Sequence, residues 1–223
     1  MASGPAEDAV AALRAAADPS RAAPMARYMR GRHPFLGVAA PRRRELTAPL
    51  LRAARAWHSA VTVGVIDDLW RLPEREFRYV GCDVARAAAR RWDPERLADL
   101  RHWITTDSWW DTVDPLAVAT GDLVEAHPTL VGDMDRWIGD DDIWVARVAL
   151  LHQVGRKDRS DAERLFSYCE LRQDDTEFFI RKAIGWALRD LARTRPDEVR
   201  RFVAAHPGLS SLSRREALKH LGG

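Results

Sequence analysis

The 223-residue sequence predicts an all-α protein built from stacked antiparallel helical hairpins. Apolar residues recur at helical spacing along almost the whole chain, and no stretch alternates apolar and polar residues over a convincing strand length. Short turns rich in proline, glycine and aspartate separate helices of about 10–17 residues. The pattern leaves two alternatives open, a solenoid of HEAT-type repeats and an irregular helical bundle.

The limits of each helix are predicted from residues that begin and end helices. Pro41, Pro73 and Pro94 stand at first-turn positions, where proline is favoured because no backbone donor is lost. The predicted helices cover residues 7–17, 24–30, 41–55, 61–70, 73–91, 94–105, 108–125, 128–138, 141–153, 158–171, 177–193, 196–205 and 213–221. In the last helix, Ser213 and Glu216 predict a capping box.

The composition indicates a globular protein in a reducing compartment. Hydrophobic residues make up 46% of the chain and charged residues 30%. Cys82 and Cys169 lie far apart without a CxxC pattern, which argues against a zinc site and a disulfide framework. No apolar run approaches the roughly 18 residues of a membrane span, and the N-terminus lacks a signal-peptide pattern. We therefore expect a cytoplasmic protein without metal or membrane attachment.

Charge is distributed unevenly along the chain. Residues 1–60 hold 10 basic and 4 acidic residues, residues 61–145 hold 9 and 18, and residues 146–223 hold 16 and 11. If the two basic ends come together, one face of the molecule becomes positive, as a polyanionic ligand requires. An ordinary mixed surface is the alternative, and charge counting does not exclude it.

Two adjacent tryptophans beside two aspartates give the strongest functional signal. Asp107 or Ser108 can cap a helix that starts there. On that helix Trp110 and Asp114 are four residues apart and share a face, while Trp109 is expected in the core. A carboxylate beside an aromatic face suits a cationic guest. The alternative is a solvated aspartate with Trp110 as packing.

Two later segments carry further candidates. Arg147 is the one charge in an apolar run, so it needs either an anionic ligand or an acidic neighbour. Phe179, Lys182 and Trp186 fall near one helix face, although such an aromatic stripe is more often core than binding site. Gly185 costs about 1 kcal/mol in a helix relative to alanine, and one use for it is the close approach of a helix or a ligand.

Two basic segments can contact phosphates, the turn that contains Arg156 and Lys157 and the C-terminal segment that contains Arg214. Plain surface exposure is the alternative for both. The sequence has no glycine-rich phosphate loop, HExxH motif or GxSxG motif, and its seven histidines show no ligand spacing.

Three segments together resemble the AlkD-type DNA alkylation repair glycosylases. They are SWWDTVD at residues 108–114, FFIRKAIGW at 178–186 and SRREALKH at 213–220, and PFLG at 34–37 and LPEREF at 72–77 fit the same family. The resemblance runs in order from about Pro24 to the C-terminus. It implies one domain over residues 1–223, a solenoid of HEAT-like repeats whose concave basic face holds duplex DNA. We expect residues 1–20 to add a loosely packed N-terminal helix.

The same resemblance implies the roles of individual residues. Asp114 corresponds to the catalytic carboxylate, and Trp110 and Trp186 correspond to tryptophans that cradle the deoxyribose of the lesion. Arg147 corresponds to a phosphate-contacting arginine near the lesion, and Tyr28 to an aromatic residue that reaches the DNA. From the charge and spacing described above, the further predicted DNA contacts are Arg156, Lys157, Phe179, Lys182 and Arg214. Pro115 departs from the family pattern, because it removes one backbone hydrogen bond and disfavours helical geometry at Asp114. A kink there would change the direction in which the carboxylate points.

The implied activity is hydrolysis of the N-glycosidic bond of N3- and N7-alkylpurines in duplex DNA, as in base excision repair. Such a purine is cationic and leaves as a neutral base, so one carboxylate suffices to stabilise the oxocarbenium-like sugar. The family resembled holds the sugar and backbone and does not flip the base. We expect a monofunctional, monomeric enzyme without cofactor, associated with the nucleoid when bound to DNA. The alternative is a catalytically silent paralogue that binds damaged or branched DNA or a protein partner.

Overall fold

The computed structural model describes residues 5–221, and the regular structure in that range is entirely helical. The prediction of an all-α protein is therefore confirmed. The α-helices are α1 (Glu7–Ala15), α2 (Pro19–Tyr28), α3 (Ala40–Ala54), α4 (Ser59–Trp70), α5 (Arg75–Ala88), α6 (Leu97–Thr105), α7 (Trp110–Ala126), α8 (Val131–Trp137), α9 (Ile143–Leu151), α10 (Ala162–Leu171), α11 (Phe178–Leu191), α12 (Pro196–Ala205) and α13 (Ser211–Leu218). Short 3-10 helices cover Ala89–Arg91, Pro94–Arg96, Pro128–Leu130 and Lys157–Arg159.

Several predicted helix starts differ from the structure, and capping hydrogen bonds explain those of α2 and α13. Helix α2 begins at Pro19, five residues before the predicted Pro24, because the Asp18 side chain accepts a hydrogen bond from the backbone N–H of Ser20 at 3.0 Å. Helix α13 begins two residues before the predicted capping box. Its N-cap is Ser210, whose hydroxyl oxygen accepts from the backbone N–H of Ser213 at 3.0 Å.

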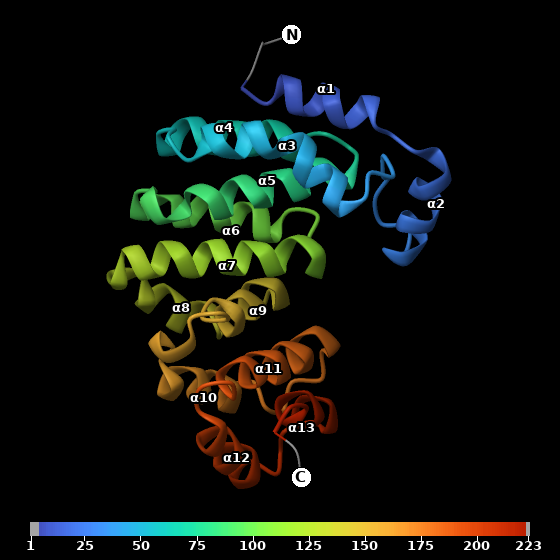
Figure 1. Cartoon of the computed structure of the whole chain (residues 1–223). Coiled ribbons are helices and arrows are strands. Elements are labelled where there is room, and N and C mark those ends of the chain that lie inside the picture. The colour runs from blue at the N-terminus through green and yellow to red at the C-terminus, as the bar shows by residue number, and fades with distance from the viewer. Residues whose placement is uncertain (1–4, 222–223) are drawn as a thin grey trace. The chain divides into compact units, whose positions relative to one another are not determined.

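The described chain divides into two compact units at the boundary between Asp99 and Leu100, which lies within α6. In the first unit α4 and α3 pack on α5, and α1 packs on α3 (Figure 1). Leu13 of α1 is fully buried, so this helix contributes to the core of the unit. The single domain over residues 1–223 and its concave basic face stay predictions, since they concern both units together.

The two N-terminal sequence motifs, PFLG at residues 34–37 and LPEREF at residues 72–77, contact each other inside the first unit. Both carboxylate oxygens of the fully buried Glu76 accept backbone N–H groups, from Leu36 at 3.0 Å and from Gly37 and Val38 at 2.9 and 3.1 Å. Gly37 has a positive φ of 88°, and an added Cβ would lie 2.1 Å from the carbonyl oxygen of Asp18. The hydrogen bonds to Glu76 therefore fix the connection between α2 and α3. The positive φ and the close approach to Asp18 explain why a glycine stands at position 37.

In the second unit alternate helices form one layer. Helix α7 packs on α9, α9 on α11 and α11 on α13, while α8, α10 and α12 connect them (Figure 1). This alternation is the arrangement expected of stacked helical hairpins. The candidate side chains described next come from α7, α9 and α11 of this one layer.

Candidate active site

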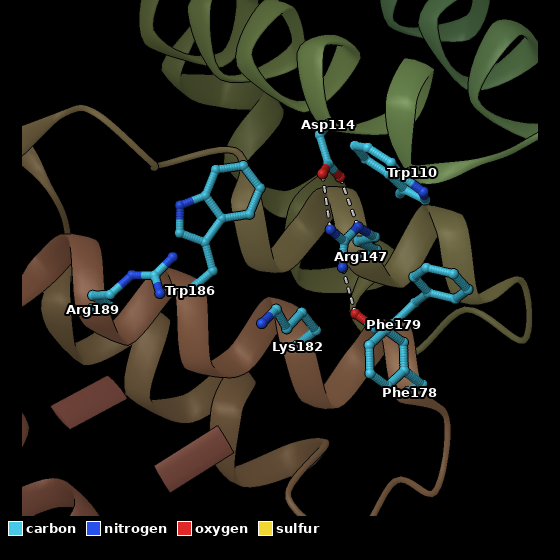
Figure 2. Close-up of a pocket in the computed structure, with 8 residues that line it drawn as sticks. All are labelled: Trp110, Asp114, Arg147, Phe178, Phe179, Lys182, Trp186 and Arg189. Carbon is cyan, nitrogen blue, oxygen red and sulfur yellow. Dashed lines mark hydrogen bonds and ion pairs between the residues drawn. The ribbon is translucent and has the colours of Figure 1, made fainter. Parts of the chain in front are cut away.

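The second unit contains a pocket of about 370 Å³ with aromatic and charged walls (Figure 2). Its lining residues are Trp110 and Asp114 of α7, Arg147 of α9, and Phe178, Phe179, Lys182, Trp186 and Arg189 of α11. Six of these were predicted as site residues from the sequence. The structure adds Phe178 and Arg189, and the spacing of three and seven residues from Trp186 and Lys182 is the signal by which Arg189 could have been found.

Helix α7 starts at Trp110, two residues after the predicted start at Ser108. The N-cap residue is Trp109, in extended conformation, and its side chain makes no capping hydrogen bond. Asp107 instead adopts a positive φ of 49°, and the Ser108 hydroxyl donates to the carbonyl oxygen of Ile104 at 2.6 Å. Those two residues therefore end α6 and turn the chain, so the predicted cap is wrong.

Trp109, which the sequence places in the core, is buried at the start of α7. It is 8% exposed and packs edge-to-face on Phe179, with ring centroids 4.9 Å apart. Trp144 of α9 packs against both rings, at 5.7 and 4.8 Å. This cluster joins α7, α9 and α11 at the pocket, so the next residue, Trp110, is presented to the pocket itself.

Arg147 forms a bidentate ion pair with Asp114 in the wall of the pocket. Its Nε lies 2.7 Å from Oδ1 of Asp114 and its Nη2 lies 2.9 Å from Oδ2. Its Nη1 donates to the backbone carbonyl of Phe179 at 2.5 Å, and the Arg147 side chain is 4% exposed. The sequence left an anionic ligand and an acidic neighbour as alternatives, and the structure supplies the acidic neighbour.

Burial governs the acidity of this carboxyl group. Removal from water raises the pKa of Asp114 above that of an exposed aspartate, and the nearby charge of Asp111 adds to the rise. The hydrogen bonds and positive charge of Arg147 lower the pKa and offset part of this effect. Each carboxylate oxygen carries two lone pairs, so one acceptor site per oxygen remains beside the guanidinium.

Trp110 and Trp186 lie on opposite sides of the Asp114 carboxylate in Figure 2. Both tryptophans are half-buried, so their rings form walls that a ligand can contact. Helix α7 continues from Trp110 through Pro115 to Ala126. The proline removes one backbone donor without ending the helix, and the bidentate pair with Arg147 fixes the position of the carboxylate.

Four predicted DNA contacts do not line this pocket. Arg156 is paired with Asp122 at 2.9 Å and also with Glu125, and the exposed Lys157 follows it with a positive φ of 57°. Arg214 donates to the carbonyl oxygens of Val203, His206 and Leu209, which lie at the C-terminal end of α12 and in the turn that follows it. Tyr28 ends α2 in the first unit and is 75% exposed. Their DNA contacts stay predictions.

Two absences can be stated for residues 5–221. No group of three or more His, Cys, Asp and Glu side chains among them is arranged to hold a metal ion. Within the same range, no helix combines the length and the apolar character of a membrane-spanning segment.

The chain resembles known proteins in both sequence and structure. Residues 9–221 match the model of a family described as DNA alkylation repair enzyme. A structure described as a predicted DNA alkylation repair enzyme from Enterococcus faecalis is 31% identical, with a TM-score of 0.86, and the match covers 92% of this chain and 97% of the other. A search of curated proteins gives no match.

More distant structures agree in fold. AlkD2 from Streptococcus mutans and smu.31 from Streptococcus mutans UA159 are each 16% identical, with a TM-score of 0.62 over 76% of this chain, and 87% and 90% of theirs are covered. At this identity the likeness concerns the fold, which is the HEAT-like fold expected from the sequence. The family match over residues 9–221 and the similarity to the enterococcal structure together show that the chain belongs to the DNA alkylation repair enzyme family.

Proposed function

We propose that this protein is a monofunctional DNA glycosylase that hydrolyses the N-glycosidic bond of cationic N3- and N7-alkylpurines in duplex DNA. The observation that carries the proposal is a largely buried carboxylate, Asp114, that lines one pocket with two tryptophans and is fixed by a bidentate arginine. A carboxylate that is held in advance stabilises positive charge where it develops, without reorganisation during the reaction.

The chemistry follows from the charge of the lesion. An alkylated purine carries its positive charge in the base, and that charge passes to the sugar as the N-glycosidic bond breaks. Asp114 stabilises the resulting oxocarbenium-like sugar and orients the attacking water through its remaining acceptor sites. The rings of Trp110 and Trp186 favour the same positive charge through their quadrupoles. The base leaves neutral, so the reaction requires no protonated acid at the base.

The pocket suits a sugar and its phosphates better than a flipped purine. Its charged lining residues are Asp114, Arg147, Lys182 and Arg189, and the remaining four are aromatic. Side-chain amides and hydroxyls, which read the edges of a base, are not among these eight residues. Lys182 and Arg189 carry the positive charge that a DNA phosphate requires. We therefore propose that the enzyme acts on the sugar without extruding the base.

The decisive experiment is single-turnover incubation with duplex DNA that contains one N7-methylguanine, followed by alkaline cleavage of abasic sites. Strand cleavage at the lesion is the expected result. A matched duplex with uracil or hypoxanthine should release little or no base, because these neutral leaving groups need a proton. Efficient release of uracil would contradict the proposed mechanism, and no release from the methylated duplex would contradict the proposed activity.

One observation favours the second candidate function, a silent paralogue that binds damaged or branched DNA or a protein. Both oxygens of Asp114 are already engaged by a buried cation, which reduces the negative charge available to a sugar. Under this alternative the protein leaves the glycosidic bond of N7-methylguanine intact, whether or not it binds the duplex. The incubation described above distinguishes the two functions.

A further inference from the structure

Glu216 of α13 lies against the pocket without lining it, and it bridges two of the cations that do. Its Oε1 lies 2.7 Å from Nζ of Lys182, and its Oε2 accepts from Nη1 of Arg189 at 2.5 Å. The Glu216 side chain is 12% exposed, whereas those of Lys182 and Arg189 are 37% and 22% exposed. The carboxylate is therefore less exposed to solvent than either cation.

The approach of α13 that makes this bridge depends on Gly185. A Cβ added at Gly185 would lie 2.5 Å from Cβ of Glu216 and 2.9 Å from the carbonyl oxygen of Ser213. The buried Ser213 fixes the contact, since its hydroxyl donates to the carbonyl oxygen of Arg181 at 2.9 Å. Glu216 thus packs directly against Gly185. Because Gly185 lies three residues after Lys182 and four before Arg189, each oxygen of Glu216 reaches one of these two cations.

The bridge holds two flexible side chains without using up their donors. Lysine has three N–H donors and arginine five, and within the described part of the chain each cation gives one to Glu216. Long cationic side chains lose rotamer entropy when they are fixed. A partner that fixes them beforehand leaves that cost out of ligand binding. The three charges sum to one positive charge, which matches the single negative charge of a phosphodiester.

We propose that Glu216 is a positioning residue that holds Lys182 and Arg189 as a clamp for one DNA phosphodiester beside Trp186. This inference rests on the proposed DNA substrate. The clamp neutralises one phosphate, and it fixes the backbone at the position where the sugar meets Asp114. Glu216 itself touches neither the DNA nor the reacting atoms.

The test measures how the affinity for unmodified duplex DNA depends on salt, with Glu216→Gln and Glu216→Asp beside the wild-type protein. The glutamine removes the charge, and the aspartate keeps it but is one methylene too short to reach both cations. We expect the slope of log Kd against log salt to fall by about 0.9 in both variants, the value for one phosphate no longer neutralised. Lys182→Gln combined with Arg189→Gln should lose at least as much, and adding Glu216→Gln to that pair should change nothing further.

A matched control is Asp135→Asn, which removes a carboxylate that also bridges two side chains of another helix, Arg164 and Tyr168, away from the pocket. It should keep the wild-type slope even where its melting temperature falls. An unchanged slope in both Glu216 variants, or a steeper slope with tighter binding, would overturn the proposal. Because the probe is unmodified DNA, this result does not depend on whether the wild-type protein excises N7-methylguanine.

Discussion

Two largely buried arginine–carboxylate pairs join α7 to α9 and to the turn that follows α9. Arg147 meets Asp114 near the start of α7, and Arg156 meets Asp122 and Glu125 near its end. The arginine side chains are 4% and 10% exposed, so both pairs are largely removed from water. The pairs differ in their surroundings, and that difference separates a candidate site from a structural contact.

The first pair lines a pocket with four aromatic side chains, and the second lines one with no Phe, Tyr or Trp. Arg147 serves one carboxylate and a backbone carbonyl, whereas Arg156 is shared between two carboxylates, one of which also pairs with Arg159. A buried ion pair by itself is weak support for a function, because it serves a fold equally well. The aromatic walls around Asp114 are what suit a cationic transition state.

The largest expected effect is on the carboxylate of the aromatic pocket. Asp114→Asn keeps the shape of the side chain and removes its charge, so we expect a loss of about 10²–10³-fold in the single-turnover rate of N7-methylguanine excision. Affinity for the methylated duplex should stay close to that of the wild-type protein. Excision at the wild-type rate would remove Asp114 from the catalytic role and favour the silent paralogue.

The next effect concerns the arginine that holds this carboxylate. In Arg147→Ala the carboxylate is no longer fixed, and we expect the excision rate to fall about 10²-fold. The melting temperature should also fall, because a buried charge loses its partner, at a cost of about 3 kcal/mol. We expect the salt dependence of DNA binding to stay unchanged, since the guanidinium of Arg147 is engaged by Asp114 and by the carbonyl of Phe179. A slope flatter by about one unit would instead support the predicted phosphate contact.

The matched variant in the second pair is Arg156→Ala, which should cost stability alone. We expect about 2 kcal/mol of destabilisation, measured by denaturant unfolding, because the carboxylates of Asp122 and Glu125 lose compensation. Excision by the folded protein and the salt slope should match those of the wild type. A slope reduced by about one unit would show that Arg156 contacts a phosphate, as the sequence predicts.

The smallest effect is a shift in pH dependence. Excision requires the ionised form of Asp114, whose pKa is raised by burial, so the rate should fall with decreasing pH at a higher pH than an exposed aspartate would give. In Arg147→Ala the arginine no longer lowers the pKa of Asp114, so the fall in rate at acidic pH should move to still higher pH. The residual rate of Asp114→Asn, corrected for spontaneous depurination, should lack this fall. A fall retained in that variant would assign the titration to another group.

The helices and six of the pocket residues were predictable because the signals are local. Spacing along one helix places Trp110 with Asp114 and Lys182 with Trp186, whatever lies opposite. One local signal failed because partners from another helix compete for the same groups. The predicted capping box of Ser213 and Glu216 does not form, because their side chains bind Arg181, Lys182 and Arg189 of α11.

The sequence by itself therefore determined the all-helical class, most helix limits and the face on which each candidate side chain lies. Only the tertiary structure decided which charge meets which. It pairs Arg147 with Asp114, directs Arg214 to backbone carbonyls at the end of α12, and brings Glu216 against Gly185. Ion pairs between helices depend on which segments lie side by side, and one sequence is compatible with many different pairings of arginines and carboxylates. Packing selects one of them, because each buried charge must find a partner within hydrogen-bonding distance.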